Sequence, residues 1–206
     1  MVILRHASSQ ELFDYWNTIR AGRAAPERSE VEPSDVRTIL GDTFILEVSL
    51  QLRSISFRLA GTRLCAAHGK ELKGLGFLAL WQEEDNFDIA RAVNRVYQEF
   101  EPMLLCYTAI SEDNRTVEYE SIMLPLMPAA GGNARILGIA TPKTNPYWLG
   151  SDPLIQNCLR NARSIAVPDA SPSLIPDYST APLEPEALPD GQRRVAHLTV
   201  FDGGLS

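Results

Sequence analysis

Residues 57–74, FRLAGTRLCAAHGKELKG, constrain the fold of this 206-residue chain more than any other stretch. Phe57 and Leu59 end a short apolar strand, and Gly61 stands where that strand gives way to a helix of about two turns. Gly69 follows at the position where a left-handed residue commonly closes a helix. A strand, a glycine step, a short helix and a further turn let a chain wrap closely over a sheet. The stretch therefore predicts a pocket beneath the wrap.

Composition limits the classes of protein that the chain can belong to. Its length suits one core of ordinary size with appendages, and its net charge of −7 argues against a surface built for phosphate or nucleic acid. No apolar run approaches the roughly 18–20 residues of a membrane span, and residues 1–10 lack the apolar core of an export signal. We therefore expect a cytoplasmic protein that contacts neither membrane nor nucleic acid. The three cysteines are widely spaced and contain no CxxC pair, so we expect them reduced and buried.

An amphipathic helix is predicted over residues 10–21, capped by Ser8 or Ser9. Its apolar stripe leaves two interpretations open. The stripe packs on the domain's own core, or it forms a dimer or partner interface, because it is aromatic and lies outside the central fold. The stripe consists of Leu12, Phe13, Trp16 and Ile19.

The central part of the chain predicts an α+β fold. A helix is expected over residues 33–40, with Pro33 as its first residue, and strands over residues 43–48 and 53–59. The longest helical pattern spans residues 83–100. Three further strands, at residues 103–110, 115–126 and 134–141, complete a five-stranded antiparallel sheet with helices packed on one face.

After Pro142 the character of the sequence changes. Residues 152–165 predict a helix, with Leu154, Ile155, Cys158, Leu159 and Ala162 on one side. Residues 167–191 are rich in proline and predict an extended or partly disordered tether. Residues 195–201 predict a strand that returns to the domain's own sheet edge or docks on another chain. We thus expect an N-terminal segment over residues 1–33, a central domain over 34–142 and a C-terminal extension over 143–206.

The motif of residues 57–81, FRLAGTRLCAAHGKELKGLGFLALW, resembles the middle of bacterial PAS domains. The likeness extends to residues 15–48 and to HLTVFDGG at residues 197–204, and the chain is similar to a group of short single-domain PAS proteins common in alphaproteobacteria. The resemblance implies a module that senses ligands or binds partners. It also implies that the N-terminal helix serves as an interface and that partners include signalling proteins such as sensor kinases.

No pattern of catalytic or metal-binding residues appears in the chain. None of its three histidines has a second ligand at metal-site spacing, and there is no nucleophile elbow, phosphate-binding loop or dinucleotide fingerprint. Flavin-binding PAS photosensors place a reactive cysteine near the equivalents of Gly76 and Phe77, and this chain has none there. Haem-binding PAS sensors use a histidine of the long helix, and residues 83–100 contain none. His68 is expected to be a core or hinge histidine, with haem ligation as the alternative.

What remains is an apolar pocket whose lining the family pattern implies. Each lining residue has a second interpretation as core filled to native density without a ligand. Arg58 and Arg63 flank the step from strand to helix, where they position an anionic ligand or pair with Glu47 or Glu71. The implied lining residues are Phe57, Leu59, Leu64, His68, Val93, Tyr97, Met103, Leu105, Tyr107, Met123 and Leu137.

The leading hypothesis from the sequence is a non-enzymatic regulatory module that acts by protein–protein interaction, as a homodimer or with a signalling protein. The alternative is a small-molecule sensor that holds a haem, a flavin or an apolar metabolite in the pocket. An enzyme would need a polar cluster converging from separate strands, which the sequence does not display.

Overall fold

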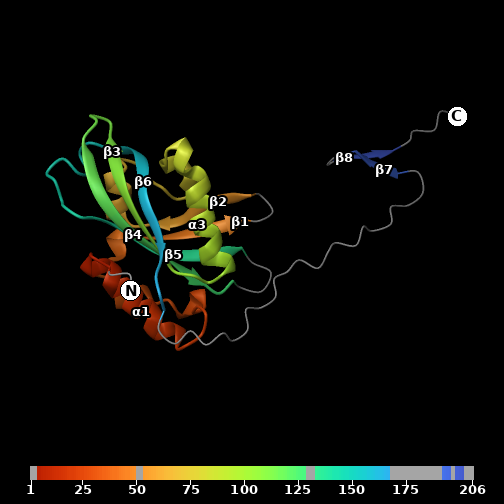
Figure 1. The fold of residues 1–206 in the computed structure, drawn as a ribbon, viewed down its shortest axis with the longest axis horizontal. Helices are drawn as coiled ribbons and strands as arrows, with labels where there is room; N and C mark the ends of the chain where they lie inside the picture. Colours follow the sequence, from red (N-terminus) through yellow and green to blue (C-terminus); the bar gives the residue numbers. More distant parts are fainter. Residues whose placement is uncertain (1–3, 50–52, 129–132, 168–191, 196–197, 202–206) are drawn as a thin grey trace. The chain divides into compact units, whose positions relative to one another are not determined.

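An antiparallel sheet of six strands forms the centre of the protein (Figure 1). The computed structural model describes residues 4–49, 53–128, 133–167, 192–195 and 198–201. The chain divides into two compact units, residues 1–175 and 176–206, and the sheet lies in the first. The strands run in the order β2-β1-β5-β4-β3-β6. Their bounds are β1 Thr43–Ser49, β2 Ser54–Ala60, β3 Met103–Ser111, β4 Thr116–Leu126, β5 Ala134–Pro142 and β6 Leu154–Ser164.

The central strands of the sheet are buried on both faces, and different elements cover each face. One face, called the inner face here, carries residues such as Phe44, Tyr107 and Met123, and it packs against α2 (Thr62–Ala67), η4 (Phe77–Leu80) and α3 (Asn86–Gln98). The opposite, outer face carries Ile122 and Leu137, and it packs against α1 (Ala7–Arg20) and the connector that follows α1. The expected helices on one face are therefore confirmed, and the N-terminal helix covers the other face.

Several helices differ from their predicted bounds. α1 is capped by His6, whose Nδ1 accepts a hydrogen bond from the Ser8 N–H at 3.2 Å, and not by Ser8 or Ser9. The helix predicted over residues 33–40 is instead two short 3-10 turns, η2 (Pro33–Val36) and η3 (Leu40–Asp42). The long helix begins with a separate 3-10 turn, η5 (Glu83–Asp85), and ends at Gln98. A further 3-10 turn, η1 (Arg28–Glu30), lies in the connector.

The helix predicted over residues 152–165 is wrong, because Leu154–Ser164 is strand β6 and pairs with β3 along its length. Two register shifts explain the error. At each shift β6 has one residue more than the stretch of β3 that it pairs with. The residues of β6 that face inward, opposite Met103–Ser111, are therefore alternately three and two positions apart in the sequence. That pattern imitates helical spacing. The sheet consequently has six strands where five were expected. The inward positions are Leu154, Asn157, Leu159, Ala162 and Ser164.

The second unit contains a two-stranded antiparallel pair, β7 (Gln192–Val195) and β8 (Leu198–Phe201). β8 lies within the predicted strand of residues 195–201, and whether that strand docks on a sheet edge stays a prediction. The predicted proline-rich tether falls on residues 168–191, outside the described residues. Within the described residues, no helix has the length and apolar character that a membrane crossing requires.

Candidate functional site

A continuous group of aromatic rings fills the space between the inner face and the helices that cover it. Tyr107 and Tyr119 stack at an angle of 12° with ring centroids 5.3 Å apart. Trp81 lies edge-on to Tyr107 at 4.9 Å, and Phe77 in turn contacts Trp81 at 5.8 Å. Phe44 and Phe57 complete the group. Aromatic side chains thus occupy the place where the family pattern implies a ligand.

The cavity left inside this core has a volume of about 20 Å³. Ligand pockets usually measure about 300–1,000 Å³, so a flavin or a haem does not fit this arrangement of side chains. Two buried polar atoms among its lining residues, Trp81 Nε1 and Asn157 Oδ1, have no hydrogen-bond partner. A donor and an acceptor beside about 20 Å³ of space suit one water molecule.

His68 is a buried hinge between α2 and β6. It follows the last residue of α2, is 5% exposed, and its Nδ1 lies 3.0 Å from the carbonyl oxygen of Leu154. Burial lowers the pKa of His68, and the Leu154 contact only partly offsets that effect. Because this carbonyl can only accept, the imidazole donates from Nδ1 and leaves Nε2 as an acceptor. Gly69 then closes the turn with a φ of +62°.

The structure brings nine of the eleven predicted lining residues together, eight of them in or against the inner core and His68 in the cavity lining. Leu59 points outward and is 47% exposed, because β2 holds one extra residue opposite Ile45 and Leu46 and its alternation shifts there. Leu137 lies in the outer core instead. That the other nine contact a ligand stays a prediction. The cavity lining that sequence reasoning missed is Phe44, Phe77, Leu80, Trp81, Ser121, Ala140 and Asn157.

The apolar stripe of α1 faces the outer side of the sheet. Leu12 and Trp16 are fully buried, Phe13 is 8% exposed and Ile19 is half-buried. The indole of Trp16 donates from Nε1 to the carbonyl of Pro125 in β4 at 2.8 Å. While α1 is seated in this way, Leu12, Phe13 and Trp16 do not form a surface for a partner. Of the two interpretations of the stripe, packing on the domain's own core is the one that this arrangement matches.

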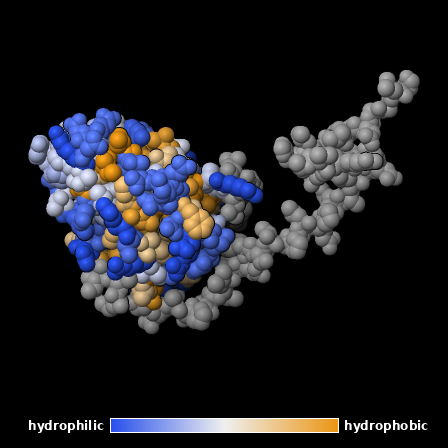
Figure 2. Space-filling model, turned by 45° about the horizontal axis from the view of Figure 1, so that its top comes forward, coloured by the Kyte–Doolittle hydropathy of each residue, from blue (hydrophilic) through white to orange (hydrophobic). Residues whose placement is uncertain are grey.

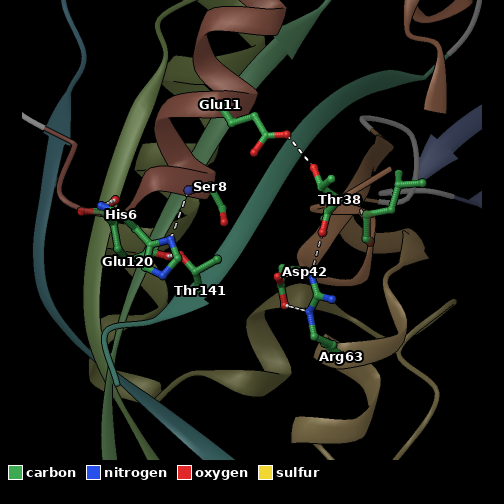
Figure 3. Close-up of polar contacts among 10 residues, drawn as sticks. His6, Ser8, Glu11, Thr38, Asp42, Arg63, Glu120 and Thr141 are labelled. Atoms are coloured by element: carbon green, nitrogen blue, oxygen red, sulfur yellow. Dashed lines mark hydrogen bonds and ion pairs between the residues drawn. The ribbon is translucent and has the colours of Figure 1, made fainter. Parts of the chain in front are cut away.

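A buried carboxylate holds the start of α1 (Figure 3). Glu120 of β4 is 1% exposed, and its two oxygens accept from the backbone N–H groups of Arg5 at 3.0 Å and His6 at 3.1 Å. These bonds satisfy the carboxylate and fix the residue that caps the helix. Charge-assisted bonds of this kind are each worth about 1.5–3 kcal/mol. Glu120 therefore anchors α1 to the sheet.

A second polar group of residues joins α1 to α2 through the loop of η2 and η3 (Figure 3). The Thr38 hydroxyl donates to Glu11 of α1 at 2.7 Å, and the Thr38 carbonyl accepts from Arg63 Nη2 at 3.3 Å. Arg63 also donates from Nε and Nη2 to Asp42, at 2.9 and 2.6 Å. The expected partners of Arg63, Glu47 and Glu71, are thus wrong.

Gly61 allows this approach of α2 to the loop. A Cβ at Gly61 would lie 2.3 Å from the carbonyl oxygens of Leu40 and Gly41, which is far closer than any real contact. The chain therefore needs glycine at the residue that precedes α2, and the close approach brings Arg63 to Asp42.

The remaining surface offers no large apolar face on the side shown in Figure 2, where hydrophobic residues form small patches among hydrophilic ones. Large exposed hydrophobic side chains occur singly on different segments, among them Phe87 at 75% and Tyr147 at 91% exposure. Scattered apolar side chains of this kind are normal on soluble domains. Among the described residues, no group of three or more histidine, cysteine or carboxylate side chains is placed to hold a metal ion.

A family profile and solved structures show which proteins the chain is similar to. The profile of the PAS domain family matches residues 4–141. Solved structures similar to the chain include a light-oxygen-voltage domain studied with a flavin analogue, at 14% identity and a TM-score of 0.43, covering 55% of this chain and 85% of that one. Another is a sensory box histidine kinase/response regulator from Burkholderia thailandensis E264, at 11% identity and a TM-score of 0.36, covering 55% and 86%. No curated protein matches the chain.

The fold and the profile together define a sensory domain of the kind found in signal transduction, and such domains are typically not catalytic. The chain belongs to the PAS domain family.

Proposed function

We propose that the chain is a non-enzymatic regulatory module that acts by binding another protein, with α1 and the sheet face beneath it as the regulated surface. The partner is a second copy of the chain or a signalling protein such as a sensor kinase. The observation that carries this proposal is that α1 and its connector cover the outer face of the sheet. There a 14-residue helix and its connector pack with apolar side chains of four strands, among them Ile45, Leu104 and Ile139.

The small size of the inner cavity supports protein binding over ligand sensing. About 20 Å³ leaves no space for a flavin, a haem or a metabolite of similar size without rearrangement of the aromatic group. A signal that does not enter the core has to act on the surface of the domain. The α1 helix is one such element, since it is attached by an apolar stripe and a few polar anchors.

The proposed mechanism is an equilibrium between a seated and an unseated α1. A partner that binds the unseated form better shifts the population toward it, by no more than its difference in affinity for the two forms. Unseating would expose the outer face and the stripe of Leu12, Phe13 and Trp16 together, and both are then available for a partner. The α1 stripe can thus be buried in the seated form and serve as the predicted interface in the unseated form.

The test loosens the anchor of α1 without touching either apolar surface. Glu120→Gln removes the negative charge that holds the N–H groups of Arg5 and His6. Glu118→Gln is the matched control, because Glu118 lies two residues earlier on β4, is exposed and pairs with Lys143. Native mass spectrometry and affinity capture from the host would compare both variants with the unmodified chain.

We expect Glu120→Gln to raise the dimeric or partner-bound fraction and to speed hydrogen exchange in α1, whereas Glu118→Gln changes neither. If α1 exchanges faster in Glu120→Gln while the bound fraction matches that of the control, α1 does not regulate partner binding. A co-purifying small mass in the unmodified protein would instead support a ligand sensor.

A further inference from the structure

A groove separate from the inner cavity lies beside α2, and it is called the α2 groove here. It is bounded by α2, by the ends of β4 and β5 and by the connection between β5 and β6, and it measures about 260 Å³. Leu64 and Ala140 line both spaces and so stand between the groove and the inner cavity. A cavity of about 150 Å³ already holds a benzene ring. The α2 groove therefore has room for a small organic molecule.

The walls of the groove are mainly apolar, and its polar side chains are the Arg63–Asp42 pair, Tyr119 and Asn145. Ala66, Ala67, Pro142 and Leu149 supply apolar wall, and the backbone of Gly150 adds to it. The Arg63–Asp42 pair lies at the groove with Arg63 the more exposed, its side chain 58% accessible against 15% for Asp42.

Tyr119 is the second polar group. It is 3% exposed, it lines the groove, and its hydroxyl has no hydrogen-bond partner among the described residues. Burial first, and then the nearby carboxylate of Asp42, raise the pKa of this phenol, so it stays protonated and can donate. A phenol donor without a protein partner, on a side chain that lines a mainly apolar groove, suits a ligand that carries an acceptor.

Arg63 selects the charge of such a ligand. Its Nε and Nη2 groups donate to Asp42 and Thr38, which fixes the plane of the guanidinium and leaves Nη1 without a partner in the described part of the chain. A preorganised guanidinium is well suited to bind a carboxylate. Because Arg63 is the one arginine among the described residues that line the groove, and Asp42 offsets its charge, a doubly charged phosphate is a poorer match than a singly charged carboxylate.

We propose that the α2 groove binds a small carboxylic acid with an apolar body. The carboxylate contacts Arg63, the body lies against Ala66, Ala67 and Leu149, and the Tyr119 hydroxyl serves as a donor inside the groove. Ligand binding at this site can be tested apart from the partner-binding function proposed above, because the groove is lined by neither α1 nor the outer face.

Benzoate and benzamide are the probes, because they share one shape and differ in charge. The whole 206-residue chain is titrated with each, and amide chemical shifts are followed by two-dimensional NMR. We expect benzoate to shift Ala66, Ala67, Ala140, Leu149 and Gly150, and to bind more tightly than benzamide. Arg63→Gln should weaken benzoate about tenfold, as expected for a charge-assisted bond, and leave benzamide unchanged.

Two further variants keep the test decisive. Arg58→Gln is the matched control, because Arg58 is exposed on β2 and does not line the groove, and it should bind benzoate like the unmodified protein. Ala66→Phe fills the groove from an exposed position and should abolish binding of both probes even if Arg63→Gln fails to fold. The proposal is overturned if benzoate gives no shifts, if the shifts lie away from the groove, or if Arg63→Gln binds benzoate as well as Arg58→Gln does.

Discussion

Trp16→Phe tests whether α1 is part of the cooperative structure. The indole of Trp16 is fully buried, and its Nε1 donates to the Pro125 carbonyl at 2.8 Å. Phenylalanine keeps most of the apolar contact and removes this donor. Losing a buried hydrogen bond costs about 1–3 kcal/mol, and the smaller ring leaves a void worth about 1 kcal/mol more. We therefore expect a loss of about 2–4 kcal/mol in the free energy of unfolding.

The assay is urea denaturation followed by circular dichroism, with Thr18→Ala as the control. Thr18 is on the same helix but exposed, so its replacement should change the free energy by less than about 0.5 kcal/mol. For Trp16→Phe the midpoint should fall while the slope m stays constant, because the surface exposed on unfolding is nearly the same. If the midpoint of Trp16→Phe moves no more than that of Thr18→Ala, the packing of α1 in the outer core does not contribute to the stability of the fold.

Hydrogen exchange of the unmodified protein separates two outcomes for α1. If α1 unseats on its own, its amides exchange with a smaller opening free energy than those of β4. If both elements share one opening free energy, α1 leaves the sheet only on global unfolding. The second result would refute the seated and unseated equilibrium of the proposed function.

Three further perturbations test the inner core and the seat of α2. Burial lowers the pKa of His68 below its value of 6.5 in the unfolded chain, so the unfolded state binds more protons than the folded state below that pH. The free energy of unfolding should therefore fall as the pH drops through about 6.5. His68→Gln should remove that part of the pH dependence. Gly61→Ala should lower the free energy of unfolding, measured by urea denaturation, by about 1–3 kcal/mol, because the added Cβ meets the η3 backbone. Gly76→Ala is the control: nothing lies within 4 Å of its added Cβ and its φ is −65°, so this change should be neutral or stabilising. Asn157→Leu should cost about 1–2 kcal/mol in the same assay, because it leaves Trp81 Nε1 without a bridging water; an unchanged midpoint would show that no such water is bound.

The sequence predicted least well the number of strands and the sheet face to which each side chain points. Local register shifts are the reason. In β6 two extra residues give inward side chains the spacing of a helix, which hid both the sixth strand and the cavity residue Asn157. In β2 one extra residue turns Leu59 outward, although Phe57 two positions earlier points inward. A shift of this kind depends on the partner strand, so the periodicity of a single segment does not reveal it.

Central strands were easy to recognise and hard to orient. Ile136 and Leu137 are adjacent in β5 and both buried, one in each core, because helices cover both faces of the sheet. A strand buried on both sides reads as a continuous apolar run and carries no alternation to assign its faces. The short helix after Gly61, in contrast, was predicted correctly, since the glycine positions at its two ends reflect backbone requirements of the turn itself.

The polar partner of Arg63 required the fold. Glu47 and Glu71 are closer in sequence or register, yet Glu47 lies beside Arg135 and Glu71 accepts from the Lys73 backbone. Asp42 is reached only because Gly61 lets α2 approach the end of η3.

The loop of Thr38 and Asp42 lies between the two proposed surfaces, and its bonds set a limit on how strongly they can influence each other. Arg63 contacts Thr38 through one hydrogen bond of 3.3 Å, and Thr38 contacts Glu11 of α1 through another of 2.7 Å. Both involve exposed side chains, so each contributes about 1 kcal/mol or less. A carboxylate that draws Arg63 away from Thr38 can therefore change the seating of α1 by at most a few-fold. The Glu120 anchor and the buried stripe dominate that equilibrium, so the groove modulates the position of α1 and does not switch it.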